Sequence, residues 1–220
     1  MQPPSRRHAG AMNRCVPSMT ARRGYSSKSK ATWLRRVQAD THGNSAKRAG
    51  FRSRAAAKLL QLDERFSLLR PGISVLELGA APGSWTQVAT RALATRGSHH
   101  SVVAVDLHSM DPVAGASVIK ADATSAEGWR AICGLLPRHD DGSLRCDLVL
   151  SDMAPKASGI RQQDHERSLE LCSLALRIGR GCLSEGGALV TKLFQGGSED
   201  RLLRWARRYA RLNRSSIAFL

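Results

Sequence analysis

Short apolar runs rich in branched residues alternate along this chain with stretches whose apolar positions recur every three or four residues. The apolar runs predict strands at Ser74–Leu78, Ser101–Asp106, Ser117–Lys120, Asp147–Ser151 and Ala188–Leu193. The periodic stretches predict helices near 84–95, 126–136, 164–183 and 198–211. Strands that alternate with helices in this way are typical of a parallel, doubly wound α/β sheet.

The first predicted strand runs into Gly79-Ala80-Ala81-Pro82-Gly83, a turn of small residues just before a predicted helix. Small residues let a ligand approach the backbone, and the helix N-terminus offers free N–H groups. The turn lacks the G-x-G-x-x-G spacing of a dinucleotide site, which disfavours NAD. A cofactor without phosphates suits it better, and the sequence therefore predicts S-adenosylmethionine.

The charge of the chain is strongly one-sided. Its 220 residues include 34 Lys and Arg against 18 Asp and Glu, a formal net charge of +16. Residues 1–54 hold 13 of the bases and a single acid, Asp40, so most of the excess lies in the N-terminal arm. Such an excess indicates a polyanionic partner, most simply a nucleic acid. No apolar run reaches transmembrane length, and no membrane association is expected.

Composition divides the chain into three expected segments. Residues 1–30 are rich in Arg and Ser and include Arg22-Arg23-Gly24-Tyr25, which predicts a mitochondrial presequence processed near Tyr25. The alternative is a disordered basic tail that holds RNA through its phosphates. Residues 31–44 are expected to form a linker, and residues 45–220 the catalytic domain.

The beginning of this domain, Ser45–Leu60, has a basic, alanine-rich helical pattern. Its cations are Lys47, Arg48, Arg52, Arg54 and Lys58. They either form a solvated helix face or contact RNA, and the pattern favours neither.

The five cysteines show no C-x-x-C spacing. They are Cys15, Cys133, Cys146, Cys172 and Cys182. This scatter predicts reduced thiols in a protein that is not secreted. Because a zinc site would need ligands gathered from distant segments, no metal is expected.

Polar residues follow the predicted strands at the edge where doubly wound sheets bind ligands. Asp106 could accept both hydroxyls of a ribose, Asp122 the exocyclic amine of an adenine, and Asp152 would lie beside the reaction centre. Each aspartate alone could equally be a helix cap or turn residue, and their joint placement favours a cofactor site. Gly83 and Trp85 follow the first strand, although a tryptophan there is more often part of the core.

Lys192 is placed within an apolar predicted strand, Leu189-Val190-Thr191-Lys192-Leu193-Phe194. A lysine there is costly unless it is paired, functional, or near enough to the strand end to reach water. Desolvation, or a second cation such as Lys58, would favour its neutral amine. A neutral amine held by Asp152 could remove a proton from an alcohol.

Several motifs together resemble one family. They are Ser53-Arg54-Ala55-Ala56-Ala57-Lys58-Leu59, Leu78-Gly79-Ala80-Ala81-Pro82-Gly83-Ser84-Trp85, Asp106-Leu107, Ser151-Asp152-Met153-Ala154-Pro155, Ser158-Gly159, Asp164-His165 and Lys192-Leu193-Phe194-Gln195-Gly196. Over roughly residues 50–212 the chain resembles the FtsJ-type ribosomal RNA 2′-O-ribose methyltransferases, and most closely their mitochondrial branch.

The resemblance implies a Rossmann-like, S-adenosylmethionine-dependent methyltransferase fold with a Lys-Asp-Lys-Glu tetrad. Its first three members would be Lys58, Asp152 and Lys192. The implied cofactor contacts are Gly83, Trp85, Asp106, Asp122 and Asp152. The implied substrate is a uridine in the peptidyl-transferase region of mitochondrial large-subunit rRNA, free or in an assembling large subunit, in the mitochondrial matrix.

The fourth member of the tetrad has no counterpart. In the family a glutamate opens a final antiparallel strand after a linker, whereas this sequence reaches Leu220 without either, and Glu199 does not match the motif. A C-terminally truncated fold with an unfilled sheet edge is therefore expected. Two alternatives stay open: a ribosome-assembly factor with little or no turnover, and a cytosolic or nuclear relative that modifies tRNA.

Overall fold

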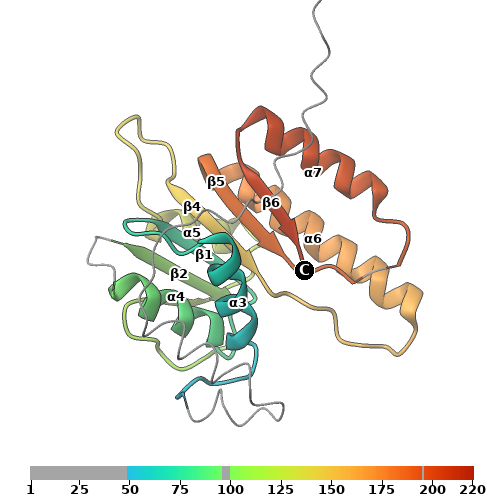
Figure 1. Cartoon of the computed structure of the whole chain (residues 1–220), viewed down its shortest axis with the longest axis horizontal. Coiled ribbons are helices and arrows are strands. Elements are labelled where there is room, and N and C mark those ends of the chain that lie inside the picture. The colour runs from blue at the N-terminus through green and yellow to red at the C-terminus, as the bar shows by residue number, and fades with distance from the viewer. Residues whose placement is uncertain (1–48, 96–99, 195) are drawn as a thin grey trace, which may run out of the picture.

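The computed structural model describes residues 49–95, 100–194 and 196–220. Its centre is a six-stranded sheet with the order β3-β2-β1-β4-β5-β6 (Figure 1). The strands are β1 Ser74–Leu78, β2 Ser101–Asp106, β3 Ser117–Lys120, β4 Cys146–Ser151, β5 Leu183–Thr191 and β6 Ser216–Phe219. All five neighbouring pairs are parallel. The strand order reverses between β1 and β4, which makes that boundary the topological switch point.

Helices cover both faces of the sheet. They are α3 Ala56–Phe66, α4 Ser84–Ala94, α5 Ala126–Leu135, α6 Arg161–Cys182 and α7 Asp200–Leu212. Leu148 and Leu150 of β4 pack in the cluster that contains α3 and α4, whereas Val149 packs with α5, α6 and α7. This alternation follows from the two-residue period of a strand. The buried apolar run of β4 therefore joins two cores, one on each face.

The predicted α/β class and the main helices are confirmed. The first three predicted strands match the observed bounds, β4 begins one residue earlier, and β5 runs from Leu183 to Thr191 instead of 188–193.

The expected helix over 45–60 is wrong in its described part, because the helix begins only at Ala56. Residues 49–55 are held by α4 instead, through bonds from Arg91 to the Ala49 carbonyl and from the Arg52 N–H to Gln87 (both 2.9 Å). The expected presequence and linker, residues 1–44, lie outside the described residues.

The edge beside β5, which was expected to be unfilled, is occupied. β6 pairs with it in parallel, with Ala188 opposite Ser216 and Thr191 opposite Phe219. Beyond β6, the Leu220 N–H donates to the Thr191 carbonyl at 2.9 Å and the Leu193 N–H to the Leu220 carbonyl at 3.0 Å. The described strands include no antiparallel partner for β5, and its outer hydrogen-bonding groups are met by β6.

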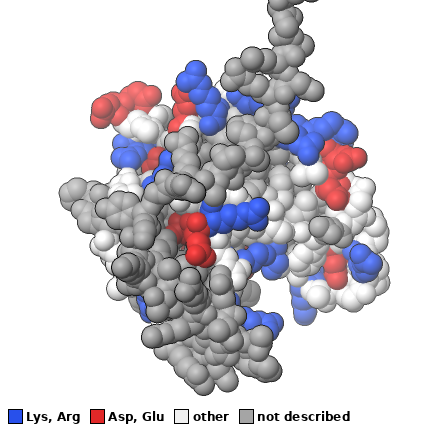
Figure 2. Space-filling view, viewed as in Figure 1, with Lys and Arg blue, Asp and Glu red and all other residues white. Residues whose placement is uncertain are grey.

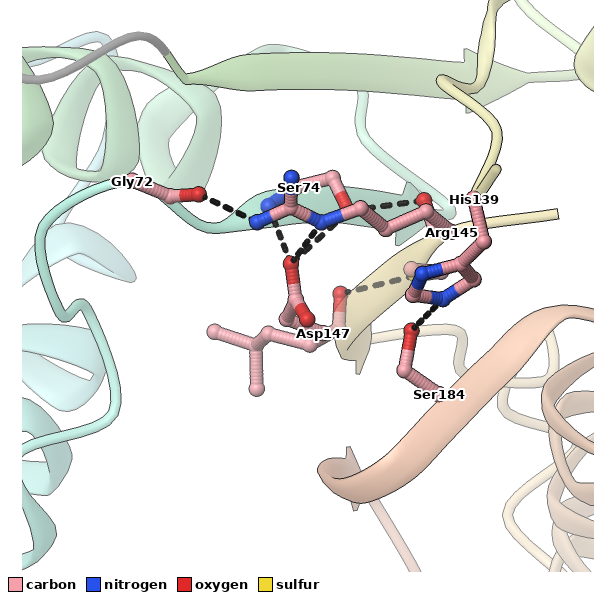
Figure 3. Close-up of polar contacts among 8 residues, drawn as sticks. Gly72, Ser74, His139, Arg145, Asp147 and Ser184 are labelled. Atoms are coloured by element: carbon pink, nitrogen blue, oxygen red, sulfur yellow. Dashed lines mark hydrogen bonds and ion pairs between the residues drawn. The ribbon is translucent and has the colours of Figure 1, made fainter. Parts of the chain in front are cut away.

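Polar contacts join β1 and β4 at their amino ends (Figure 3). The Ser74 N–H donates to Asp147 Oδ2 at 2.8 Å, and the Ser74 hydroxyl donates to the Arg145 carbonyl at 2.7 Å. The Arg145 guanidinium bonds the Gly72 carbonyl at 2.8 Å and lies 3.4 Å from Asp147 Oδ2. This network fixes the amino ends of the two central strands, and their carboxyl ends emerge at the opposite edge. Within the described part of the chain, no helix has the length and apolar character that crossing a bilayer requires.

Glu77, in the middle of β1, is only 2 % exposed, and its Oε2 accepts a 2.6 Å hydrogen bond from the Thr86 hydroxyl on α4. Burial raises the pKa of this carboxyl from 4.5 to about 8; the Thr86 bond opposes this effect, and the nearby Asp152 and Asp106 charges add to it. The folded state therefore holds a proton that the unfolded chain releases above pH 4.5.

The resulting stability is complete below about pH 4.5 and is lost as the pH rises toward about 8. We expect Glu77→Gln to reduce this loss, which is on the order of a few kcal/mol at about 1.4 kcal/mol per pKa unit. Urea unfolding at pH 5 and pH 8 measures it, with Glu64→Gln on the exposed side of α3 as the control. An unchanged pH dependence in Glu77→Gln would contradict the assignment.

Candidate functional site

Four central strands end at the same level, because their parallel registers are aligned. Leu78 of β1 lies opposite Val105 of β2 and Ser151 of β4, and Ser151 lies opposite Thr191 of β5. The residues that follow are Gly79, Asp106, Asp152 and Lys192. Sheet register therefore gathers a glycine turn, two carboxylates and an amine along one edge.

The turn after β1 approaches its neighbours closely. Gly79 has a φ of +73°, and a Cβ there would come within 2.6 Å of Met153 Cγ in the loop after β4. Gly83, with a φ of +102°, precedes the first turn of α4. A Cβ at Gly83 would lie 3.3 Å from both Met110 Sδ and Val113 Cγ2. The nearest atom to a Cβ at Gly83 would be Arg52 Nη1, at 2.6 Å. Glycine is therefore required at both positions, because each has a positive φ and stands in close contact with a neighbouring segment.

Arg52 joins the two loops beside this turn. Its Nη1 donates to the carbonyls of Pro82 and Asp111, and its Nη2 donates to the Pro112 carbonyl, all at 2.8 Å. The planar guanidinium suits such a multiple contact, which a lysine could not reproduce. Sequence alone offered solvent or RNA as the partners of Arg52. The structure gives it three backbone carbonyls instead.

Asp106 lies between the same two loops. Its Oδ2 accepts from the Ala81 N–H at 2.9 Å and its Oδ1 from the His108 N–H at 2.7 Å. A carboxylate has about four acceptor positions, so capacity for further donors remains. The side chain is half-buried at the end of β2, which is compatible with the predicted ribose contact.

Two other predicted cofactor residues make internal contacts. Asp122 is exposed, and its Oδ1 accepts from both the N–H and the hydroxyl of Thr124, which lowers the pKa of the carboxyl. Trp85 is 2 % exposed and donates its indole N–H to the Ala55 carbonyl at 2.8 Å. Asp122 thus shapes the turn before α5, and Trp85 fastens α3 to α4. Their contacts with a cofactor stay predictions.

Lys192 and Asp152 are brought together. Lys192 Nζ lies 3.3 Å from Asp152 Oδ1, and the two side chains are 28 % and 26 % exposed. The ammonium also lies 5.7 Å from the centre of the Phe194 ring. The expectation that Lys192 lies inside the strand is wrong, because β5 ends at Thr191. The amine therefore keeps contact with solvent and has a carboxylate partner, which avoids most of the cost of burial.

The other charged candidates are not joined to this pair. Lys58 is exposed on α3 and makes no ion pair or hydrogen bond through its side chain within the described residues. Glu199 turns back to accept from the Gly197 N–H at 2.7 Å and lies 3.8 Å from His165 Nε2. Glu199 thus closes a short turn with Gly197 just before α7.

One face of α6 holds the backbone that follows β5. The Cys172 thiol donates to the Lys192 carbonyl at 2.8 Å, and the Ser168 hydroxyl accepts from the Phe194 N–H at 2.9 Å. His165 contacts the Phe194 carbonyl through Nδ1 at 2.6 Å and the Ser198 hydroxyl through Nε2 at 2.8 Å. Burial raises the pKa of the Cys172 thiol, which keeps its hydrogen available for donation.

These three polar residues, at positions i, i+3 and i+7, form what we term the α6 ladder. Sequence reasoning missed the ladder. Its signal in the sequence was a row of polar residues at positions where the helix faces the core. It also missed the Ser151 hydroxyl, which is buried beside Asp152 and has no hydrogen-bond partner among the described residues.

The residues at this edge fit S-adenosylmethionine. The glycine turn at the α4 N-terminus suits an amino-acid end, and Asp106 offers acceptors for ribose hydroxyls. The buried Ser151 hydroxyl adds a polar group that still lacks a partner. Among the described residues, no group of three or more His, Cys, Asp or Glu side chains could hold a metal ion.

Comparisons with known proteins agree with this geometry. Residues 51–215 match the family of FtsJ-like methyltransferases. The ribosomal RNA large subunit methyltransferase E of Acidiphilium cryptum is 42% identical over 199 residues, which cover 90% of this chain and 83% of the relative. That of Rhodospirillum rubrum is 45% identical over 178 residues, covering 80% and 65%. A crystal structure described as a Plasmodium falciparum ribosomal RNA methyltransferase has a TM-score of 0.61 at 26% identity, over 72% of this chain and 86% of its own.

The α6 ladder predicts a local change in hydrogen exchange. Ser168→Ala removes the acceptor of the Phe194 N–H, a bond that contributes about 1 kcal/mol. We expect exchange of the Phe194 amide to rise by up to about tenfold, measured by NMR or mass spectrometry. Ser173→Ala is the matched control, because the Ser173 hydroxyl bonds the Leu169 carbonyl within the same helix. Equal protection of Phe194 in both variants would exclude this role for Ser168.

Proposed function

The chain belongs to the FtsJ-like methyltransferase family, and from this premise we propose that it methylates ribosomal RNA on a ribose 2′-hydroxyl, with S-adenosylmethionine as donor. The observation that supports this best is the Lys192–Asp152 ion pair at the edge where the glycine turn and Asp106 also lie. The relatives' name, ribosomal RNA large subunit methyltransferase E, supports rRNA as the substrate.

We assign the cofactor contacts to Gly83, Trp85, Asp106, Asp122 and Asp152. S-adenosylmethionine, when bound, supplies a methyl group that its sulfonium already activates. The protein therefore needs to hold the donor and the alcohol in line, and positioning can provide much of the rate. Arg52 contributes by fixing the two loops between which Asp106 lies.

In this proposal Lys192 first gives its ammonium proton to solvent, which its 28 % exposed side chain allows. The neutral amine then accepts the proton of the ribose 2′-hydroxyl as that oxygen forms its bond to the methyl carbon and the sulfonium sulfur leaves. Asp152 holds the amine in place through their 3.3 Å contact. Lys58, exposed on α3, is free to contact an RNA phosphate. A uridine of the mitochondrial large-subunit rRNA is the proposed target, and the mitochondrial matrix the proposed location, both supported by the family resemblance and by the Arg- and Ser-rich residues 1–30.

A catalytically weak ribosome-assembly factor is the second candidate. It is favoured by Glu199, which binds the Gly197 N–H instead of joining Lys192. RNA binding without methyl transfer by the wild-type chain would support this candidate over the enzyme.

Substitutions of Lys192 test the role of its amine. Lys192→Ala should lower kcat by about 100-fold to 10,000-fold, the usual contribution of a general base. Lys192→Arg should lose as much, because a guanidinium keeps its charge but does not give up its proton in proteins. Transfer of labelled methyl groups to large-subunit rRNA measures both, with calorimetry of cofactor binding as a check on folding.

Arg70→Ala, an exposed change before β1 at the amino end of the sheet, is the control for surface charge. Retention of most activity by Lys192→Arg would mean that the residue acts by charge and that the base lies elsewhere. Absence of both cofactor binding and methyl transfer in folded wild-type protein would refute the proposed function.

Substitutions of Arg52 and Arg54 distinguish the positioning of loops from contact with RNA. Arg52→Lys loses the three-carbonyl contact and should weaken S-adenosylmethionine binding by about tenfold, because the loops beside Asp106 are no longer fixed. Arg54→Lys is the matched control, since Arg54 is exposed and contacts neither loop among the described residues. Calorimetry without RNA compares them, and equal affinities would remove Arg52 from this role.

A further inference from the structure

Helix α7 carries a dense row of arginines. Its sequence is DRLLRWARRYARL, with Asp200 as its only acid. The arginines are Arg201, Arg204, Arg207, Arg208 and Arg211, and all five are exposed. Figure 2 shows blue side chains over α7 at the upper right of the molecule.

The packing of α7 determines which of its faces points to solvent. Ala206 and Ala210 are buried, and Leu202 packs against the core between α6 and the sheet. Since these three residues face the interior, the arginines at 201, 204, 208 and 211 form one outward stripe with intervals of three and four residues. The stripe is about 15 Å long at 1.5 Å per residue.

Two stacked aromatic rings lie beside this stripe. Trp205 is 36 % exposed, and its ring stacks on that of Tyr209 with centroids 5.7 Å apart and an interplanar angle of 9°. Among the described residues, Trp205 is the only exposed aromatic side chain. Arginines beside an exposed, stacked ring match the chemistry of phosphates beside bases.

The positive charge of the stripe is not neutralised by the protein. None of the five arginines of α7 forms an ion pair in the part of the chain that the structure describes, whereas Arg214 nearby pairs with Glu185 at 3.1 Å. A membrane surface is a poorer partner, because the apolar face of α7 is packed against the core and cannot enter a bilayer. The unpaired cations and the ring together favour RNA.

We propose that the outward face of α7 is a second RNA-contact surface of this enzyme, in which arginines bind phosphates and Trp205 stacks on an unpaired base. This inference rests on the proposed rRNA substrate. The surface lies on the α5–α6 side of the sheet, over the β5–β6 edge, whereas α4 packs on the opposite face (Figure 1). It therefore contributes to RNA affinity and leaves the chemical step unchanged.

The test compares two double variants of the full chain with equal loss of charge. Arg204→Gln/Arg208→Gln should raise KM for a large-subunit rRNA fragment by about tenfold or more and leave kcat unchanged. The salt dependence of log affinity should become shallower by about 1.5, because each lost phosphate contact contributes about 0.7 to 0.9. Arg65→Gln/Arg70→Gln, on the exposed end of α3 and the following loop, should change neither quantity beyond a small general effect.

Trp205→Ala provides an independent measurement. It should weaken binding to single-stranded RNA by about tenfold and leave the salt slope unchanged, since stacking displaces no counterions. If both α7 variants bind RNA like the Arg65→Gln/Arg70→Gln control, the inference is overturned. Loss of binding to anionic vesicles or to an acidic protein, with RNA affinity intact, overturns it equally.

The outcome is separable from that of the proposed function. RNA affinity is measured without cofactor, so a wild-type chain that binds RNA but transfers no methyl group still tests α7 through the salt slope. If the wild-type chain methylates rRNA and the α7 variants have an unchanged KM, the RNA-contact surface is refuted and the proposed methyltransferase function is retained.

Discussion

The aligned, parallel pairing of β1, β4 and β5 is the constraint on which the site depends. Leu78, Ser151 and Thr191 lie opposite one another, so the next residue of each strand emerges at the same edge. A shift of one strand by a single residue would turn Asp152 or Lys192 toward the opposite face of the sheet. The 3.3 Å contact between those two side chains therefore depends on backbone hydrogen bonds made much deeper in the sheet.

Two devices convert this register into fixed side-chain positions. The α6 ladder holds the backbone immediately after β5, which limits the directions that Lys192 can take. Arg52 fixes the loops after β1 and β2, which contain the glycine turn and the residues around Asp106. Both devices act on backbone groups, so they fix the course of the chain directly.

The alternation of apolar runs was enough to predict the sheet, because buried parallel strands leave an unmistakable pattern in sequence. It was also enough to bring Asp106, Asp152 and Lys192 to one edge, since topology alone puts strand ends there. It could not predict β6, because Ser216–Phe219 is short and its partner is chosen by the free edge of β5. It misplaced the start of α3, because long-range bonds from Arg91 and Gln87 override the helical propensity of residues 49–55.

Charge illustrates the same limit most clearly. From the sequence alone, Arg52 and Arg204 cannot be told apart, because each lies in a basic segment and could be solvated or bind RNA. In the structure Arg52 donates to three carbonyls and has little left to offer a polyanion, whereas Arg204 lies on an exposed face beside Trp205 without a carboxylate partner among the described residues. The net charge of a chain thus indicates its attraction to nucleic acid. Which surface binds the nucleic acid depends on which guanidinium groups are left without partners inside the protein.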